Sequence, residues 1–250
     1  MDLGLTGKIA LVTGATSGVG REIALSLAGE GATIAVNYRS SAEDAHALVG
    51  EITAKGGKAK AYEANVADFA AVKTMVEQTV KDFGGLNILI NNAGLALRQR
   101  FMETKPKDWH RQIDACLYGA IHCCHAAAPH LDAAKNGRIV SVIGDSSRVG
   151  ESGLAIVAAA RAGVAALMKS LAREFGRSGT TANTVSLGLV ETPHDKEWVD
   201  ANREKLIKLY PLRRLGLPGD VAPMVALLAS PQSGWITGQV LSISGGFSMV

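Results

Sequence analysis

Short apolar runs alternate with amphipathic, helix-like stretches along the whole 250-residue chain. We expect strands at 9–13, 33–37, 58–63, 86–91, 138–143, 181–187 and 239–242. Helices are expected between them, at 18–30, 41–55, 68–83, 107–134, 154–176 and 218–230. Consecutive strands joined by helices of this length need crossover connections, which make the sheet parallel and put helices on both of its faces. The pattern predicts an α/β fold, with one domain over 1–250 and a doubly wound, seven-stranded parallel sheet.

One stretch departs from this alternation. Residues 190–217 are mixed and charged, and they include Trp198, Tyr210 and Pro211. In an open α/β sheet, an insertion beyond the carboxyl end of a strand is where a lid over a bound substrate would lie. We therefore expect a lid-like insertion here.

Composition argues against several classes of protein. A net charge of +3, with no block of like charge, gives no indication of nucleic-acid binding. The longest apolar stretch, 154–168, is interrupted by Arg161, and it falls short of the roughly 20 residues that a membrane helix needs. The three cysteines show no disulfide pattern and the first residues show no signal-peptide pattern, so we expect a cytoplasmic protein without a membrane span.

Metal-ligand residue types cluster once, in His122-Cys123-Cys124-His125 within the expected helix 107–134. Adjacent residues on a helix point about 100° apart, so these four side chains cannot converge on one ion unaided. We expect packing here and no metal site.

A glycine-rich turn follows the first expected strand and opens the first expected helix. It reads Thr13-Gly14-Ala15-Thr16-Ser17-Gly18-Val19-Gly20. Gly14 permits the turn, Gly18 lets backbone approach a pyrophosphate, and Gly20 lets the helix pack closely on the strand. The helix N-terminus then offers N–H groups and a positive dipole to the phosphates. The turn predicts a Rossmann-type site for a nicotinamide dinucleotide.

Further motifs follow in a characteristic order. Asn91-Asn92-Ala93-Gly94 comes after the fourth expected strand, and Ile236-Thr237-Gly238-Gln239 and Ser244-Gly245-Gly246 lie near the other end. Together with the glycine turn they resemble the short-chain dehydrogenase/reductase family over the full length of the chain. Within that family the chain is similar to 3-oxoacyl reductases and hydroxyacyl-CoA dehydrogenases. The resemblance implies that 91–94 braces the sheet and lines the adenosine side of the cofactor.

The end of the second expected strand bears on the choice of cofactor. NAD-preferring relatives place an acidic residue there, whereas this chain has Tyr38 followed by Arg39. A guanidinium pairs with a 2′-phosphate, so we expect NADP(H) in preference to NAD(H). Asn65 stands where the family usually has Asp and would contact adenine. The other residues expected at the cofactor are Gly14, Thr16, Ser17, Gly18, Val19, Gly20, Val66, Asn92, Ala93, Gly94, Arg161, Gly188 and Thr192.

The family's chemistry uses a tyrosine as acid and base, a lysine four residues later, a serine thirteen residues before the tyrosine, and an asparagine on the preceding long helix. An ungapped alignment places these positions, in that order, at Val157, Arg161, Gly144 and Cys116. All four are substituted. Valine transfers no proton, and a positioned acid or base is worth about 10²–10⁴ in rate. Hydride transfer to a carbonyl by the family's route is therefore not expected.

A replacement acid must come from elsewhere, because no tyrosine lies between Tyr118 and Tyr210 to restore the pair by a local shift. Asp145 is the nearest candidate, at the carboxyl edge of the fifth expected strand, although an aspartate in a loop is more often a turn former or a cap. More distant candidates are Glu151, Tyr118, His194 and Tyr210.

Three functions remain open. The chain is a non-catalytic homologue that supports an acyl-type oxidoreductase, an enzyme with a changed acid or base (redox or non-redox), or a dinucleotide-sensing binding protein. In the family, helices equivalent to the alanine-rich 107–134 and 154–176 form the dimer and tetramer contacts, so we expect self-association or a related subunit there. A run of basic residues would meet the phosphate of an acyl-CoA or acyl-carrier ligand, although such a run is more often a solvated face; it comprises Arg98, Arg100, Lys105, Lys107 and Arg111.

Overall fold

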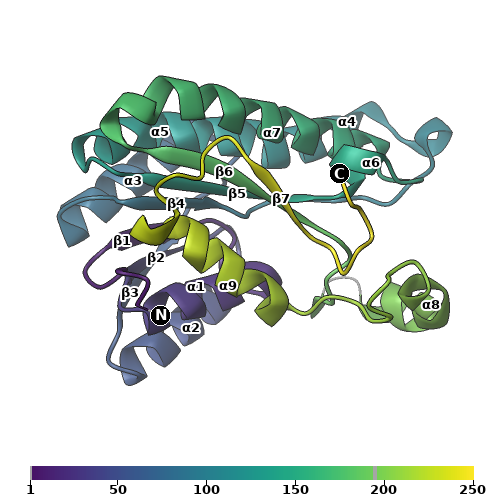
Figure 1. The fold of residues 1–250 in the computed structure, drawn as a ribbon, viewed down its shortest axis with the longest axis horizontal. Coiled ribbons are helices and arrows are strands. Elements are labelled where there is room, and N and C mark those ends of the chain that lie inside the picture. Colours follow the sequence, from purple (N-terminus) through teal and green to yellow (C-terminus); the bar gives the residue numbers. More distant parts are fainter. Residues whose placement is uncertain (1, 194–195) are drawn as a thin grey trace.

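The described residues form a seven-stranded parallel sheet with helices on both faces (Figure 1). The structure is a computed structural model and describes residues 2–193 and 196–250. The strands are β1 (Ile9–Val12), β2 (Thr33–Tyr38), β3 (Lys58–Glu63), β4 (Ile88–Asn91), β5 (Arg138–Gly144), β6 (Thr181–Leu187) and β7 (Val240–Ile243). Their order across the sheet is β3-β2-β1-β4-β5-β6-β7, and every pair is parallel, which confirms the predicted fold class.

The helices match the expected ranges closely, except that 107–134 is divided and that the short helix Ser146–Val149 and the lid helix Lys196–Ile207 were not predicted. They are α1 (Gly18–Gly29), α2 (Ala42–Ala54), α3 (Phe69–Phe83), α4 (Pro106–Ile113), α5 (Gly119–Ala133), α6 (Ser146–Val149), α7 (Ala155–Phe175), α8 (Lys196–Ile207) and α9 (Pro218–Ala229). Local chemistry sets their ends. At α3, for example, the Asp68 side chain accepts hydrogen bonds from the amides of Ala70 and Ala71, and Gly84 closes the helix at φ +89°.

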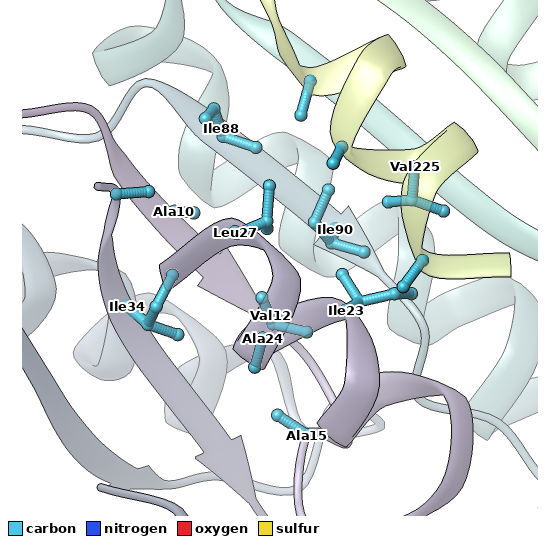
Figure 2. Close-up of a cluster of buried hydrophobic side chains, with 14 of the residues drawn as sticks. Ala10, Val12, Ala15, Ile23, Ala24, Leu27, Ile34, Ile88, Ile90 and Val225 are labelled. Atoms are coloured by element: carbon cyan, nitrogen blue, oxygen red, sulfur yellow. The ribbon is translucent and has the colours of Figure 1, made fainter. Parts of the chain in front are cut away.

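Alternation of side chains along the central strands builds a core on each face of the sheet. Val12 and Ile90 pack with Ile23 and Leu27 of α1 and with Val225 of α9 on one face (Figure 2). On the other face, Leu11, Leu89 and Ile139 pack with side chains of α3, α5 and α7. Burying one such aliphatic side chain contributes about 1.5–3 kcal/mol. These two core layers hold the strands in place, and the residues expected at the functional site follow the carboxyl ends of the strands.

The single helix expected over 107–134 is interrupted. Between α4 and α5 the chain runs through a π-helical segment, Asp114–Tyr118. Gly119 follows it because a Cβ at this position would lie 2.8 Å from Cγ2 of Val66. A π segment takes an extra residue into a turn and redirects the side chains beside it. Here the redirected residue is Cys116, which faces the loop after β4 and bonds to Leu95.

The stretch 190–217 leaves the sheet and returns to it, as expected of an insertion. An isolated bridge between Val190 and Gly216 joins its two ends. Between them lies α8, a helix that the charged composition did not predict. The guanidinium of Arg98 lies 4.4 Å from the ring centroid of Trp198 on this helix, which ties α8 to the loop after β4.

Helix α7 packs over β5 and β6 on one face of the sheet. The segment 155–178 is long and apolar enough to cross a membrane by length and composition alone; an 18-residue window of it has mean hydropathy 1.5 and is 28% buried. Its inward residues Val157, Val164 and Met168 belong to the core. A second face of the helix stays exposed and is formed by Ala155, Ala159, Ala162 and Ala166.

Candidate functional site

The residues expected at the site gather at the carboxyl edge of the sheet. Strands β1 and β4 are neighbours, and the chain continues to β2 and β3 on one side and to β5, β6 and β7 on the other. In open α/β sheets, ligands bind in the crevice outside this switch point. The turn after β1 (13–20) meets the segment after β4 (92–94) there, and we call these two segments the glycine cradle.

The cradle has no room for side chains at two of its glycines. A Cβ on Gly14, whose φ is +60°, would lie 3.0 Å from Cα of Ala93. A Cβ on Gly20 would collide with the carbonyl oxygen of Gly14 and with the side-chain amide of Asn92. The start of α1 therefore packs directly on the turn, with the first amides of the helix at the crevice. Such a cradle suits the pyrophosphate of a dinucleotide.

Hydrogen bonds between the turn and the segment after β4 hold the turn in place. The Asn92 amide Nδ2 donates to the carbonyl oxygens of Thr13 and Gly14, each at 3.0 Å. In return, Oγ1 of Thr13 accepts from the backbone amides of Asn92 and Ala93 at 2.9 and 3.0 Å. The bracing expected of the segment 91–94 thus acts on the cradle itself.

Asn37 is a positioning residue that sequence reasoning missed. It is 2% exposed near the end of β2. Its Oδ1 accepts from the amide of Gly14 at 3.2 Å, and its Nδ2 donates to the carbonyl oxygen of Ala64 at 3.1 Å. Its own carbonyl accepts from the amide of Ala15. The available signal was a polar side chain within the otherwise apolar run 33–37.

The adenosine side of the crevice is formed after β2 and β3. Tyr38 is half-buried at the end of β2 and Arg39 is exposed beyond it. Oδ1 of Asn65 accepts from the amide of Ala67 at 3.2 Å, so this oxygen shapes the turn into α3. Val66 is buried, with its carbonyl oxygen 2.9 Å from Nδ1 of His122.

The other end of the crevice is closed by the segment after β6. A Cβ on Gly18 would lie 3.1 Å from Cγ2 of Thr192, so the first residues of the lid cross the cradle. Gly188 packs against the ring of Tyr210, because a Cβ there would lie 3.0 Å from Cε1. Of the two expected contact residues of this segment, Thr192 thus lies against the cradle, whereas Gly188 packs against Tyr210 and Ser244.

The four positions aligned with the family's catalytic set lie together, and we call them the reaction centre. A Cβ on Gly144 would lie 2.8 Å from Nη1 of Arg161. A Cβ on Gly94 of the cradle would lie 3.3 Å from Sγ of Cys116 and 3.8 Å from Nη2 of Arg161. Cys116 and Val157 share a buried cluster with Ala160. The helical spacing places Val157 and Arg161 on one face of α7.

No side chain of this centre is suited to proton transfer. Val157 is apolar and 0% exposed. Sγ of Cys116 is 3.4 Å from both the amide nitrogen and the carbonyl oxygen of Leu95, which engage it locally. A guanidinium keeps its proton at any ordinary pH and is a poor acid.

Asp145 is engaged in hydrogen bonds that leave it unsuited to proton transfer. Its carboxylate is 1% exposed and accepts hydrogen bonds from the hydroxyls of Ser186, Ser242 and Ser248. It thereby joins the end of β5 to β6, β7 and the last residues of the described chain. The weak replacement candidate is a structural tie in this arrangement.

The more distant candidates are also engaged elsewhere. Tyr118 is 50% exposed, with its ring 5.9 Å from that of His122. Glu151 pairs with Arg98 at 2.8 Å. The hydroxyl of Tyr210 accepts from the amide of Leu189 at 2.8 Å, and burial raises the pKa of this phenol, the opposite of what proton transfer near neutrality needs. His194 lies outside the described residues.

The His-Cys-Cys-His segment faces two different surroundings. The rings of His122 and His125 lie 5.5 and 5.3 Å from the ring of Phe69 on α3. Cys123 and Cys124 point into the core, where burial raises the pKa of both thiols. Their side chains serve packing.

The basic run after β4 is divided. Arg98 is bound to Glu151 and stacked on Trp198. Arg111 pairs with Asp108 at 3.3 Å. The remaining members, exposed at the surface, are Arg100, Lys105 and Lys107.

Comparison with known proteins agrees with this architecture. The profile of the family described as Enoyl-(Acyl carrier protein) reductase matches residues 14–248. The chain is 41% identical over 242 residues to the 3-oxoacyl-[acyl-carrier-protein] reductase FabG of Staphylococcus aureus, covering 97% of this chain and 98% of that protein. It is 36% identical over 247 residues to (2S)-[(R)-hydroxy(phenyl)methyl]succinyl-CoA dehydrogenase subunit BbsD of Thauera aromatica, covering 99% of each.

Solved structures give the same result. A dehydrogenase/reductase from Sinorhizobium meliloti superposes with TM-score 0.92 at 35% identity, covering 99% of this chain and 98% of that one. A short-chain dehydrogenase/reductase from Serratia marcescens superposes with TM-score 0.91 at 37% identity, covering 98% and 99%. With its parallel sheet, glycine cradle and these relatives, the chain belongs to the short-chain dehydrogenase/reductase family.

Proposed function

We propose that this chain binds NADP(H) in the glycine cradle but has lost the family's proton-transfer residues, and that it serves as a non-catalytic subunit of an acyl-type oxidoreductase. The observation that carries the proposal is Val157, which is fully buried one helical turn before Arg161 and in one cluster with Cys116. The position that needs an acid holds a hydrocarbon. Loss of a positioned acid costs about 10²–10⁴ in rate.

The preference for NADP(H) is supported by the end of β2. Tyr38 brings no negative charge there, and Arg39 is exposed beyond it. No hydrogen bond or ion pair to a described residue engages Arg39, so its guanidinium is available to a 2′-phosphate. A bound NADP(H) would be a hydride source for a catalytic partner or variant. In this chain the first amides of α1 would hold its phosphates and Arg161 would hold its ribose.

The subunit role is supported by the exposed face of α7. Four alanines one or two turns apart leave a flat apolar surface, which a second helix can approach closely. Together with α5 this face is the proposed contact for a second copy or a related subunit. BbsD, one of the relatives, is by name a subunit of a CoA-ester dehydrogenase. An acyl-CoA or acyl-carrier phosphate would meet Arg100, Lys105 and Lys107.

A second candidate is an active reductase with another proton donor. It is favoured by the reductases among the relatives, at 41% identity over nearly the full length. Asp145 is the test case for it. Its three serine partners argue for a structural tie, so we expect Asp145→Asn to change stability and not turnover.

Binding and turnover separate the two candidates. The chain, expressed alone, is titrated with NADPH by calorimetry and assayed for NADPH oxidation with acetoacetyl-CoA. We expect binding without turnover. Turnover within about 10²-fold of an ordinary reductase would overturn the non-catalytic proposal, and loss of that turnover in Asp145→Asn would support the second candidate.

Restoration gives the complementary test. The variant carrying Val157→Tyr, Arg161→Lys, Gly144→Ser and Cys116→Asn should gain reductase activity if only the chemistry has been lost. The wild-type chain and the variant without Val157→Tyr are the controls. A folded, NADPH-binding variant with no activity would contradict the assignment of these four positions.

A further inference from the structure

The guanidinium of Arg161 lies inside the reaction centre without a counter-charge from the described chain. The side chain is half-buried, with Nη1 over Gly144 and Nη2 beside Gly94. Within residues 2–193 and 196–250, no hydrogen bond or ion pair engages it. A guanidinium carries five N–H donors and a permanent charge, and a partly desolvated charge requires an anion or a set of acceptors.

The carboxylates on the neighbouring loops are already engaged. Asp145 accepts from three serine hydroxyls. Glu151 pairs with Arg98 at 2.8 Å, and Glu191 accepts both arms of Arg203 at 2.9 and 2.6 Å. None of these three is left to neutralise Arg161.

A second donor points to the same place. Ser146 is 5% exposed at the start of α6, and its hydroxyl makes no hydrogen bond to any residue that the structure describes. A Cβ built on Gly144 would lie 3.5 Å from this hydroxyl oxygen and 2.8 Å from Nη1 of Arg161. A cationic fork and a buried hydroxyl thus flank one point, where Gly144 contributes no side chain. Val157 and Cys116 supply an apolar wall that strengthens a charged contact.

We propose that Arg161 and Ser146 form a binding site for a small carboxylate. This carboxylate is one group of the ligand that the chain binds once the cofactor is in place. The planar fork of Arg matches two carboxylate oxygens, and the serine adds a third donor. This inference rests on the proposed function, because the site lies beside the cradle and the cradle would place the nicotinamide next to it. In the family's route a substrate oxygen is protonated at this place. In this chain the same place would bind a negatively charged oxygen.

Titration of the full chain with acetate tests the site without any cofactor. Binding is followed by the NMR linewidth of carbon-13 acetate, with inorganic phosphate titrated in parallel. Arg161→Met should weaken acetate binding by roughly 10- to 100-fold, the range for a hydrogen-bonded charged partner. Ser146→Ala should weaken it by about 3- to 10-fold, as loss of one hydrogen bond does. Lys169→Met is the matched control, because it removes an exposed cation from the same helix and should change nothing.

Arg161→Lys keeps the charge and removes the fork, so it should fall between the wild type and Arg161→Met. It also serves if Arg161→Met fails to fold. Equal acetate affinity in wild type, Arg161→Lys and Ser146→Ala would overturn the site. Phosphate binding without acetate binding would overturn the carboxylate class.

NADPH titration of the same variants separates this inference from the proposed function. Ser146→Ala should bind NADPH as the wild type does. A chain that binds acetate through Arg161 but not NADPH would contradict the proposed function and leave the anion site standing. A chain that binds NADPH but not acetate would contradict the anion site and leave NADPH binding in the proposed function standing.

Discussion

The glycine cradle and the reaction centre meet at Gly94, yet they are built differently. The cradle is held by paired polar groups: Asn37 and Asn92 bond to the backbone of the turn, and Thr13 accepts from the backbone amides of the segment after β4. The reaction centre has a buried valine, a glycine and a guanidinium without a described partner. The first region is specified by hydrogen bonds that position phosphates. The second is formed by apolar volume and one charge, and we propose that it lacks a proton-transfer group.

This difference leads us to expect that cofactor binding and chemistry are separable in the fold. The bonds that shape the cradle run between the ends of β1, β2 and β4, whereas the reaction centre lies on β5, on α7 and on the π segment 114–118. Changes at the second region should therefore leave the hydrogen bonds of the cradle intact.

Gly20→Ala should have the largest effect, since its methyl group would collide with the carbonyl oxygen of Gly14. Overpacking of this kind costs about 1–3 kcal/mol, and the displaced turn should lose NADPH affinity by more than about 100-fold. Urea unfolding and calorimetry measure the two effects. Gly29→Ala, on the same helix with nothing within 4 Å, is the control and should be silent in both. Equal behaviour of the two variants would mean that the cradle does not bind the cofactor.

Asn37→Ala should destabilise the chain by about 2 kcal/mol, because buried backbone partners lose their hydrogen bonds. NADPH affinity should fall with it, since the amide of Gly14 loses its acceptor. Asn183→Ala is the matched control: it removes a buried amide that bonds to Ile236 and Gln239, away from the cradle. It should lower stability by a similar amount and leave NADPH affinity unchanged. An equal loss of NADPH affinity in both variants would contradict the view that Asn37 acts on cofactor binding through the cradle.

Gly144→Ser tests the reaction centre alone. The added side chain would press on Nη1 of Arg161, and we expect a loss of about 1–2 kcal/mol in the free energy of unfolding. Arg161→Lys should relieve most of it, which gives a coupling of about 1 kcal/mol in a double-mutant cycle. NADPH affinity should fall much less in Gly144→Ser than in Gly20→Ala, because only the proposed ribose contact of Arg161 is disturbed and the cradle is not. Strict additivity in the cycle would show that the guanidinium does not occupy this space.

Arg39→Ala should have the smallest effect on the fold and a specific one on the cofactor. Because Arg39 is exposed, the unfolding free energy should move by less than about 0.5 kcal/mol. NADPH affinity should fall by about tenfold with NADH affinity unchanged, as expected for one charge-assisted contact. Lys58→Ala removes an exposed cation at the other end of the sheet and should leave both unchanged. A preference for NADH in the wild-type chain would overturn the choice of cofactor.

The strands and most helices could be predicted because burial on two faces leaves an apolar run and each crossover needs an amphipathic helix. The break at 114–118 could not, since a π segment uses the same residue types as an α-helix and is decided by packing around Gly119. Helix α8 was missed because its charged faces resemble a loop. At the site, glycine spacing located the cradle. The partners of Asp145 and the space above Gly144 depend on strands far apart in the sequence.

The contact between Arg161 and Gly144 also bears on the order in which the two positions can be altered. A Cβ at position 144 would lie 2.8 Å from Nη1 of Arg161, which is the far end of a flexible side chain. Serine at 144 therefore requires the guanidinium to move, whereas lysine at 161 has no such nitrogen. We expect the double change to be tolerated better than Gly144→Ser alone.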